Sequence, residues 1–360
     1  MPVHEPIHQS IVIGAGRAGL SASRHLTRRG IEHPVLDAND APGGARQHRW
    51  DSLGMDDVHG VADLPDATAP TRSQARANEV VPTYFADYER RFDLPVVRPV
   101  TVDRVTSEGD LLVVHAGDHT AHPHADQRHR HWTQPFVPHY PGTETFAGEQ
   151  LHTADYPGPA HFVGKRVLVV GGGASAVQFL GELAPVTDTI WVTRREPVWR
   201  TDDFHPDAGL EAVTPVADRV RRGLPPASVV SVTGLMLRPQ EREAERLGAY
   251  RRRPMFAAIE PDGVRWADGT FEPVDVILWA TGFRPAVGHL APLHLRSPEG
   301  GIQLEVGGSV QNAVTAVLER RVQLVGYGPS ASTIGANRAG RAAAIAVQRQ
   351  LSAQDDGMSA

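Results

Sequence analysis

Residues 10–19 of this 360-residue chain read SIVIGAGRAG, a short apolar run of strand length that leads directly into a glycine-rich turn. A helix is expected from residue 20 to residue 29, where Gly30 ends it. A second strand at 34–36 then delivers Asp37. This order of strand, glycine turn, helix, strand and acid is that of a βαβ dinucleotide-binding unit. The chain is therefore predicted to begin with an α/β nucleotide-binding domain.

The glycines of this turn each have a physical role in the prediction. Gly14 tightens the turn, Gly16 lets a phosphate approach the backbone amides at the helix start, and Gly19 lets the helix pack closely on the strand. Asp37 follows at about 20 residues, where an acid accepts ribose hydroxyls. A second backbone approach is expected just after it. The predicted contacts of the first nucleotide are Gly14, Gly16, Ala18, Gly19, Asp37, Gly43 and Gly44.

The same order recurs near mid-chain, where RVLVV at 166–170 runs into GGGASA at 171–176. A helix to residue 183 and a strand at 189–192 are expected next. Where an acid would then select NAD, the chain has two arginines, and a guanidinium suits the 2′-phosphate of NADPH. The alternative is a solvated basic patch. The predicted contacts of this nucleotide are Gly171, Gly173, Ser175, Ala176, Arg194 and Arg195.

Composition narrows the chemistry and the setting. The chain has no cysteine, which excludes a disulfide scaffold, a thiolate metal site and a redox-active cysteine pair. Any redox chemistry must therefore reside in a bound cofactor, and no metal is expected. The net charge of −6 gives no reason to expect nucleic acid. No apolar run approaches the roughly 20 residues of a membrane span, and the N-terminus lacks a secretory signal pattern, so a cytoplasmic location is expected.

With these motifs in place, the chain resembles the flavin-containing monooxygenase-like superfamily. Within it, the chain is similar to bacterial NAD(P)/FAD-dependent oxidoreductases of the class B flavin monooxygenase type. The resemblance covers nearly the whole sequence and rests on both glycine turns and on PGG at 42–44, HRWDSL at 48–53, ATGFRP at 280–285 and GYG at 326–328.

The resemblance implies an α/β fold of two Rossmann-like, three-layer dinucleotide-binding domains. FAD would bind the first, and NADPH the second, which is inserted into the first. The implied limits are 1–150 and 285–350 for the FAD domain, 151–284 for the NADPH domain and 351–360 for a flexible tail.

The resemblance also suggests roles for individual residues. Thr281 and Gly282 would abut the bound flavin and NADPH, while Arg49 and Trp50 would line the flavin side. The helix that starts near residues 332–337 would turn its N-terminal amides toward the isoalloxazine ring.

Phe146, Gly148, His152 and Tyr156 fall in the spacing F-x-G-x-x-x-H-x-x-x-Y. This is similar to the fingerprint of class B flavin monooxygenases, with an aromatic other than tryptophan at its end. By resemblance, the segment would help to couple the two domains as NADPH docks. The alternatives are a chance pattern in a linker and a hydrogen-bonded structural role for His152.

These observations favour an enzyme in which NADPH reduces FAD and the reduced flavin uses O₂ to oxygenate a small organic substrate. The catalytic residues are unknown, with Arg49 and His152 as candidates. One alternative is an NADPH:acceptor flavin reductase without oxygenation, and another is a non-catalytic or impaired homologue. The sequence predicts neither the substrate nor the oligomeric state.

The segment at 119–131 departs from the resemblance. Relatives carry Asn-Ala-Thr-Gly-Thr-Trp before Pro-Phe-Val-Pro, whereas this chain reads DQRHRH at 126–131 before WTQPFVP. The codons CAA CGC CAC CGG CAC encode QRHRH, and a shift of one base turns them into NATGT. We therefore hypothesise a compensated frameshift, which resequencing of the gene tests. If the segment is real, a polar run of poor β-propensity replaces a strand beside the flavin and weakens FAD affinity.

Overall fold

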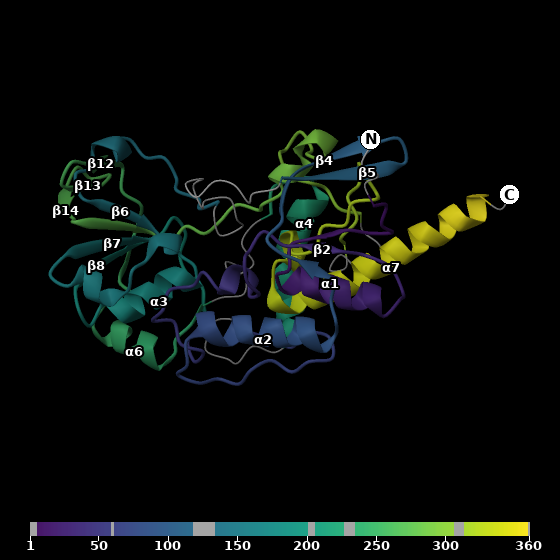
Figure 1. Cartoon of the computed structure of the whole chain (residues 1–360). Helices are drawn as coiled ribbons and strands as arrows, with labels where there is room; N and C mark the ends of the chain where they lie inside the picture. Colours follow the sequence, from purple (N-terminus) through teal and green to yellow (C-terminus); the bar gives the residue numbers. More distant parts are fainter. Residues whose placement is uncertain are drawn as a thin grey trace.

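The computed structural model of the protein describes residues 6–58, 61–117, 134–200, 206–226, 235–305 and 313–358. These residues form two α/β parts, and each part contains a parallel sheet and one of the two glycine turns (Figure 1). We call them the first part and the second part, in the order of their parallel sheets along the chain. The segment at 119–131, to which the frameshift hypothesis applies, lies outside the described residues.

The first part has a three-stranded parallel sheet of order β1-β2-β3, with Val12 opposite Val35 in register. An antiparallel hairpin, β4–β5, follows it in the chain. The strands are β1 (Val12–Ile13), β2 (Val35–Leu36), β3 (Val96–Val97), β4 (Thr101–Glu108) and β5 (Leu111–Gly117). The helices are α1 (Arg17–Thr27), α2 (Ala77–Arg91) and α7 (Thr333–Met358). The predicted strand, turn, helix and strand are all present, with α1 starting three residues earlier than expected.

Helices α1 and α7 pack against each other over much of the length of α1 (Figure 1). Gly340 permits this contact, because a Cβ there would lie 2.5 Å from Ser21 Oγ and 2.7 Å from the backbone nitrogen of Ala22. The predicted tail at 351–360 is helical as far as Met358. No glycine or proline interrupts the chain between residues 351 and 356, so nothing local ends the helix there.

The second part has a five-stranded parallel sheet of order β11-β8-β7-β15-β6. The central strand β7 is buried along four of its five residues, as its continuous apolar sequence predicts for a sheet covered on both faces. The strands of this sheet are β6 (Glu149–His152), β7 (Arg166–Val170), β8 (Asp188–Val192), β11 (Arg252–Arg253) and β15 (Val276–Trp279). Its neighbours are the helices α3 (Ala174–Leu183) and α6 (Pro239–Arg246) and an antiparallel sheet of β12 (Ala258–Glu260), β13 (Gly263–Arg265) and β14 (Phe271–Pro273).

Two features differ from the expected domain limits. Strand β6 belongs to the second sheet, so the expected boundary between residues 150 and 151 falls inside a strand. Helix α4 (Pro206–Arg221) was expected in the NADPH domain, but it packs on the first part (Figure 1). The reason is apolar burial, since Val220 belongs to one hydrophobic cluster with Ile302 and Tyr327. The remaining pair of short strands, β9 (Trp199–Arg200) and β10 (Leu235–Met236), is parallel.

A hydrophobic cluster joins the two parts. It contains Leu20 and Val35 from the first part together with Val167, Phe179 and Leu278 from the second. Burial of this much apolar surface between the parts favours a defined arrangement of the two nucleotide-binding units.

Candidate functional site

Both glycine turns open into a cavity of about 3590 Å³. A pocket for one drug-sized ligand has roughly 300–1,000 Å³, so this space is large enough for more than one extended ligand. Its lining includes residues from α1, the end of β2, the residues that follow β8, the start of α3, and the connection after β15. The cavity therefore lies at the carboxyl ends of parallel strands, where ligands of open α/β sheets bind.

The glycines of the first turn differ in the space around them. A Cβ at Gly14 or Gly16 would meet no atom within 4 Å, so both positions leave the cavity side open. A Cβ at Gly19 would lie 1.8 Å from the carbonyl oxygen of Gly14, which makes glycine obligatory for packing. Gly44 packs closely against this turn, because a Cβ there would lie 2.9 Å from Gly16 Cα. No side chain caps the N-terminus of α1 at Gly16, so its first amides are available to an anion.

Asp37 stands at the end of β2, lines the cavity and is only 3% exposed. Its Oδ1 accepts a hydrogen bond from Asn39 Nδ2 at 3.0 Å. Its Oδ2 accepts one from Arg98 Nε at 2.8 Å. The acid predicted to hold a ribose is thus fixed by two neighbours before any nucleotide arrives.

Three arginines gather on the cavity wall beside this turn. Arg17 donates to the carbonyl oxygens of Ala62 and Asp63, at 2.5 and 3.0 Å. Burial, with the charge of Arg17 nearby, lowers the pKa of Arg46 to about 10. Burial, with the charge of Arg46 nearby, lowers the pKa of Arg49 to about 9. Since like charges disfavour each other here, an anionic group in the cavity would stabilise all three, and a pyrophosphate fits that requirement.

The second glycine turn has the same design. Gly171, at φ +146°, lies against the backbone, since a Cβ there would be 2.3 Å from the carbonyl oxygen of Ala280. Gly173 and Ser175 line the cavity at the start of α3. Ala176 is fully buried and therefore packs inside the helix–sheet interface.

Arg194 and Arg195 are exposed and line the same cavity beyond the end of β8. The turn that carries them is held by Arg252, whose Nε donates to Thr193 Oγ1 at 2.8 Å. Arg252 also forms an ion pair of 2.8 Å with Glu196. No motif marks Arg252 in the sequence, and its partners lie more than 50 residues earlier in the chain.

Two connections between the parts run side by side. The backbone nitrogen of Phe136 donates to the carbonyl oxygen of Gly282 at 2.9 Å, and that of Arg284 donates to Gln134 at 3.0 Å. Thr281 Oγ1 donates to the carbonyl oxygen of Phe136. Thr281 and Gly282 both line the cavity.

His152 locks these connections to β6. Its Nε2 lies 3.0 Å from the carbonyl oxygen of Gly282, and its Nδ1 accepts from the backbone nitrogen of Ala154 at 3.3 Å. This pattern places the proton on Nε2 of a neutral ring. Burial lowers the pKa of His152, and the residue is 3% exposed. Both ring nitrogens therefore bond backbone groups, and this favours a structural role for His152 over a catalytic one.

The other residues of the fingerprint-like spacing are also structural. A Cβ at Gly148 would lie 2.4 Å from the carbonyl oxygen of Asp275, so only glycine fits between the two strands. Phe146 packs against the hydrophobic cluster around β15. Tyr156 stacks on Phe162, with ring centroids 5.5 Å apart. The segment thus ties the second sheet to the connections that border the cavity.

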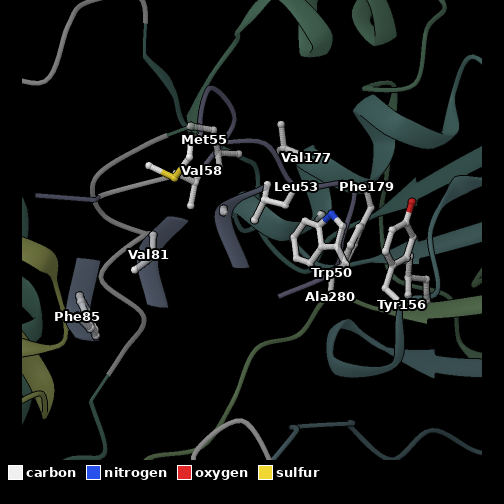
Figure 2. Packing of buried hydrophobic residues seen from close by; sticks show 14 of the residues in the cluster. Trp50, Leu53, Met55, Val58, Val81, Phe85, Tyr156, Val177, Phe179 and Ala280 are labelled. Atoms are coloured by element: carbon white, nitrogen blue, oxygen red, sulfur yellow. The ribbon is translucent and has the colours of Figure 1, made fainter. Parts of the chain in front are cut away.

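Trp50 occupies a different place from the one expected beside a flavin. It is 6% exposed and packs on Phe179 and Tyr156, with ring centroids 4.6 and 5.8 Å away (Figure 2). Its indole N–H donates to Glu182 Oε1 at 2.8 Å. A large apolar ring with one polar group needs both burial and an acceptor, and the junction with α3 supplies both. Its neighbour Arg49 does line the cavity.

Glu182 was not singled out from the sequence. Its Oε2 accepts from Ser52 Oγ at 2.6 Å and from the Tyr156 hydroxyl at 3.0 Å, in addition to the Trp50 bond on Oε1. Burial raises the pKa of this carboxyl group even though the three hydrogen bonds act in the opposite direction. A carboxylate of α3 therefore joins the second part to the chain that follows Gly44.

Residues 11–222 match the family described as pyridine nucleotide-disulphide oxidoreductase. The flavin-containing monooxygenase from Stenotrophomonas maltophilia is 34% identical, with a TM-score of 0.77 over 95% of this chain and 98% of that one.

Two curated relatives are more distant. A Baeyer-Villiger monooxygenase of Streptomyces coelicolor is 27% identical over 74% of this chain and 54% of its own length. An indole-3-pyruvate monooxygenase of Oryza sativa is 28% identical over 77% of each chain. This chain thus spans about half the length of the first of these relatives.

Three kinds of feature bear on the setting and chemistry of the site: membrane-spanning helices, metal-ligand groups and cysteines. In the part of the chain that the structure describes, no helix is long and apolar enough to cross a membrane. Within those same residues, no group of three or more histidine, aspartate or glutamate side chains is placed to hold a metal ion. The sequence has no cysteine, so the disulphide chemistry in the matched family's description has no thiol to use here. The shared motifs, fold and 34% identity show that the chain belongs to the flavin-containing monooxygenase family, as its sequence predicted.

Proposed function

We propose that this protein is an FAD-dependent monooxygenase that uses NADPH and O₂ to oxygenate a small organic substrate. The observation that carries the proposal is the opening of both glycine turns into one cavity. Each turn stands at the N-terminus of a helix and at the end of a parallel strand, and this arrangement suits a dinucleotide pyrophosphate.

The first turn suits FAD. Gly14 and Gly16 leave the backbone open to the pyrophosphate, Gly44 packs against Gly16, and Asp37 would accept the ribose hydroxyls. The second turn suits NADPH, because Arg194 and Arg195 offer two guanidinium groups for a 2′-phosphate.

When bound, the flavin would supply hydride acceptance and oxygen activation, which no side chain can supply. The chain's own residues bind, orient and exclude water. His152 and the paired connections at 134–136 and 281–284 hold the two nucleotide sites at a fixed separation. Arg49 lines the cavity wall, where its positive charge would attract a negatively charged group of a cofactor or substrate. We further propose the domain limits implied by the resemblance, with two changes. Strand β6 belongs to the NADPH domain, and helix α4 packs with the FAD domain.

The test is the fate of oxygen. The protein, loaded with FAD, is mixed with NADPH, isotopically labelled O₂ and a panel of ketones, sulfides and amines. A monooxygenase incorporates one labelled oxygen atom into a product for each NADPH consumed. NADPH consumption with an artificial electron acceptor alone, without label in any product, would instead support a flavin reductase.

A further inference from the structure

A buried line of charges lies behind the acid of the first nucleotide site. It runs from Asp37 through Arg98 to Glu89, which belongs to α2. The side chains of Arg98 and Glu89 are 12% and 11% exposed, although neither belongs to a predicted motif. Buried charges are costly unless they are paired, so a retained cluster of this kind calls for an explanation.

The hydrogen bonds of Asp37 leave room for a diol. An ionised carboxylate has about four lone-pair positions, two on each oxygen. Arg98 uses one position on Oδ2 and Asn39 uses one on Oδ1. Each oxygen therefore keeps one position, and two neighbouring hydroxyls of a ribose need two acceptors that are held side by side.

Arg98 is itself held from the opposite side. Its two terminal nitrogens donate to the two oxygens of Glu89, at 2.7 and 2.6 Å, in the bidentate geometry that fixes a guanidinium plane. Its remaining nitrogen, Nε, then points to Asp37. Because Glu89 lies on α2, the helix anchors the orientation of the acid at the end of β2.

We propose that Arg98, held by Glu89, is a positioning residue that fixes the Asp37 carboxylate for recognition of the adenosine ribose diol of FAD. The proposal rests on the proposed function, since it assigns the first site to FAD. It goes further in naming residues outside the cavity motif on which affinity for the nucleotide depends. A carboxylate held in this way accepts hydroxyl donors, and its negative charge disfavours a phosphate at that ribose.

The experiment is a double-mutant cycle on FAD affinity, measured by quenching of flavin fluorescence in the apoprotein. The variants are Arg98→Met, Asp37→Ala and the pair combined. We expect Arg98→Met to weaken FAD binding by about tenfold, the effect of about 1.4 kcal/mol. In the Asp37→Ala background, Arg98→Met should cause no further loss, because Arg98 acts through Asp37.

Two further variants guard against a purely structural effect. Arg90→Met removes an exposed arginine that lies next to Glu89 on α2. Among the described residues Arg90 is ion-paired only to Asp87, so this change should leave FAD affinity unchanged. Glu89→Gln keeps Arg98 but weakens its bidentate partner, so it should cause a smaller loss of FAD affinity. This variant provides the test if Arg98→Met fails to fold. Thermal unfolding without FAD reports the fold of each variant.

The outcomes are distinct. Loss of affinity in Arg98→Met that vanishes in the Asp37→Ala background supports the inference. Unchanged affinity in Arg98→Met, or a loss that persists without Asp37, overturns it. Failure of the unmodified protein to bind FAD under any condition would reject the proposed function itself, and that result is separate from both.

Discussion

Gly19 and Gly16 stand three residues apart in the same turn, yet they are required for different reasons. A Cβ at Gly19 would lie 1.8 Å from the carbonyl oxygen of Gly14, whereas a Cβ at Gly16 would meet no atom within 4 Å. The first glycine therefore serves folding and the second serves the ligand.

This difference predicts opposite phenotypes. Gly19→Ala should lower the free energy of unfolding by about 1–3 kcal/mol or more, because the backbone must shift to admit the methyl group. Gly16→Ala should leave that free energy nearly unchanged and weaken FAD binding. Denaturant unfolding and FAD titration of both variants provide the check. Equal destabilisation by the two substitutions would contradict the assignment.

Arg194 tests the choice between NADPH and NADH. It is exposed on the cavity wall, so its removal should not disturb the fold. Arg194→Ala should raise the KM for NADPH about 10- to 100-fold, since a hydrogen bond to a charged group contributes ~1.5–3 kcal/mol. The KM for NADH should change little. Arg251→Ala, at an exposed arginine outside the cavity lining, is the matched control. Equal effects on both cofactors would refute the phosphate role.

At the scale of elements, helix α3 is tied to the first part by one carboxylate. Glu182 accepts hydrogen bonds from Trp50, Ser52 and Tyr156. Glu182→Leu leaves the buried Trp50 indole and Tyr156 hydroxyl without this acceptor, and each unsatisfied buried group costs about 1–3 kcal/mol, whereas the exposed Ser52 hydroxyl can turn to water. We therefore expect strong destabilisation, measured by denaturant unfolding. Glu182→Gln keeps an acceptor oxygen for the indole and should retain the fold.

The same carboxyl group predicts a pH dependence. Because burial raises its pKa in the folded state, the folded protein binds more protons than the unfolded chain just above the ordinary carboxyl pKa. Its contribution to stability is therefore greatest below that ordinary value and is lost as pH rises through the raised pKa. Glu182→Gln cannot titrate, so its melting temperature should gain on the unmodified protein over that interval. A constant difference between the two proteins would contradict the raised pKa.

Sequence patterns within a short stretch predicted the helices and strands, but they did not predict side-chain contacts between residues far apart in the chain. Each glycine turn lies within about 30 residues of the strands on either side of it, and both of these strand–turn–helix–strand units are confirmed. Trp50 meets Glu182 across 132 residues, and Arg98 meets Asp37 across 61. Such pairs depend on how whole elements pack, so the sequence placed Trp50 beside the flavin and gave no sign of Arg98. His152 was found by its spacing, but its partner Gly282 lies 130 residues away.

At the scale of the whole molecule, two parallel sheets deliver two glycine turns to one cavity. A hydrophobic cluster shared by the two parts and the paired connections beside His152 link the two nucleotide-binding units. Helix α4 shows that the chain is less modular than the sequence suggested, because it leaves the second part to cover the first. FAD and NADPH would thus occupy one continuous space.

The most direct test of that claim is the visible absorption spectrum of the purified protein, recorded with FAD before and after anaerobic addition of NADPH. We expect a protein-bound flavin band that bleaches when NADPH is added, because the two sites share the cavity. A protein that stays colourless after incubation with FAD, or a bound flavin that NADPH does not bleach, would contradict it.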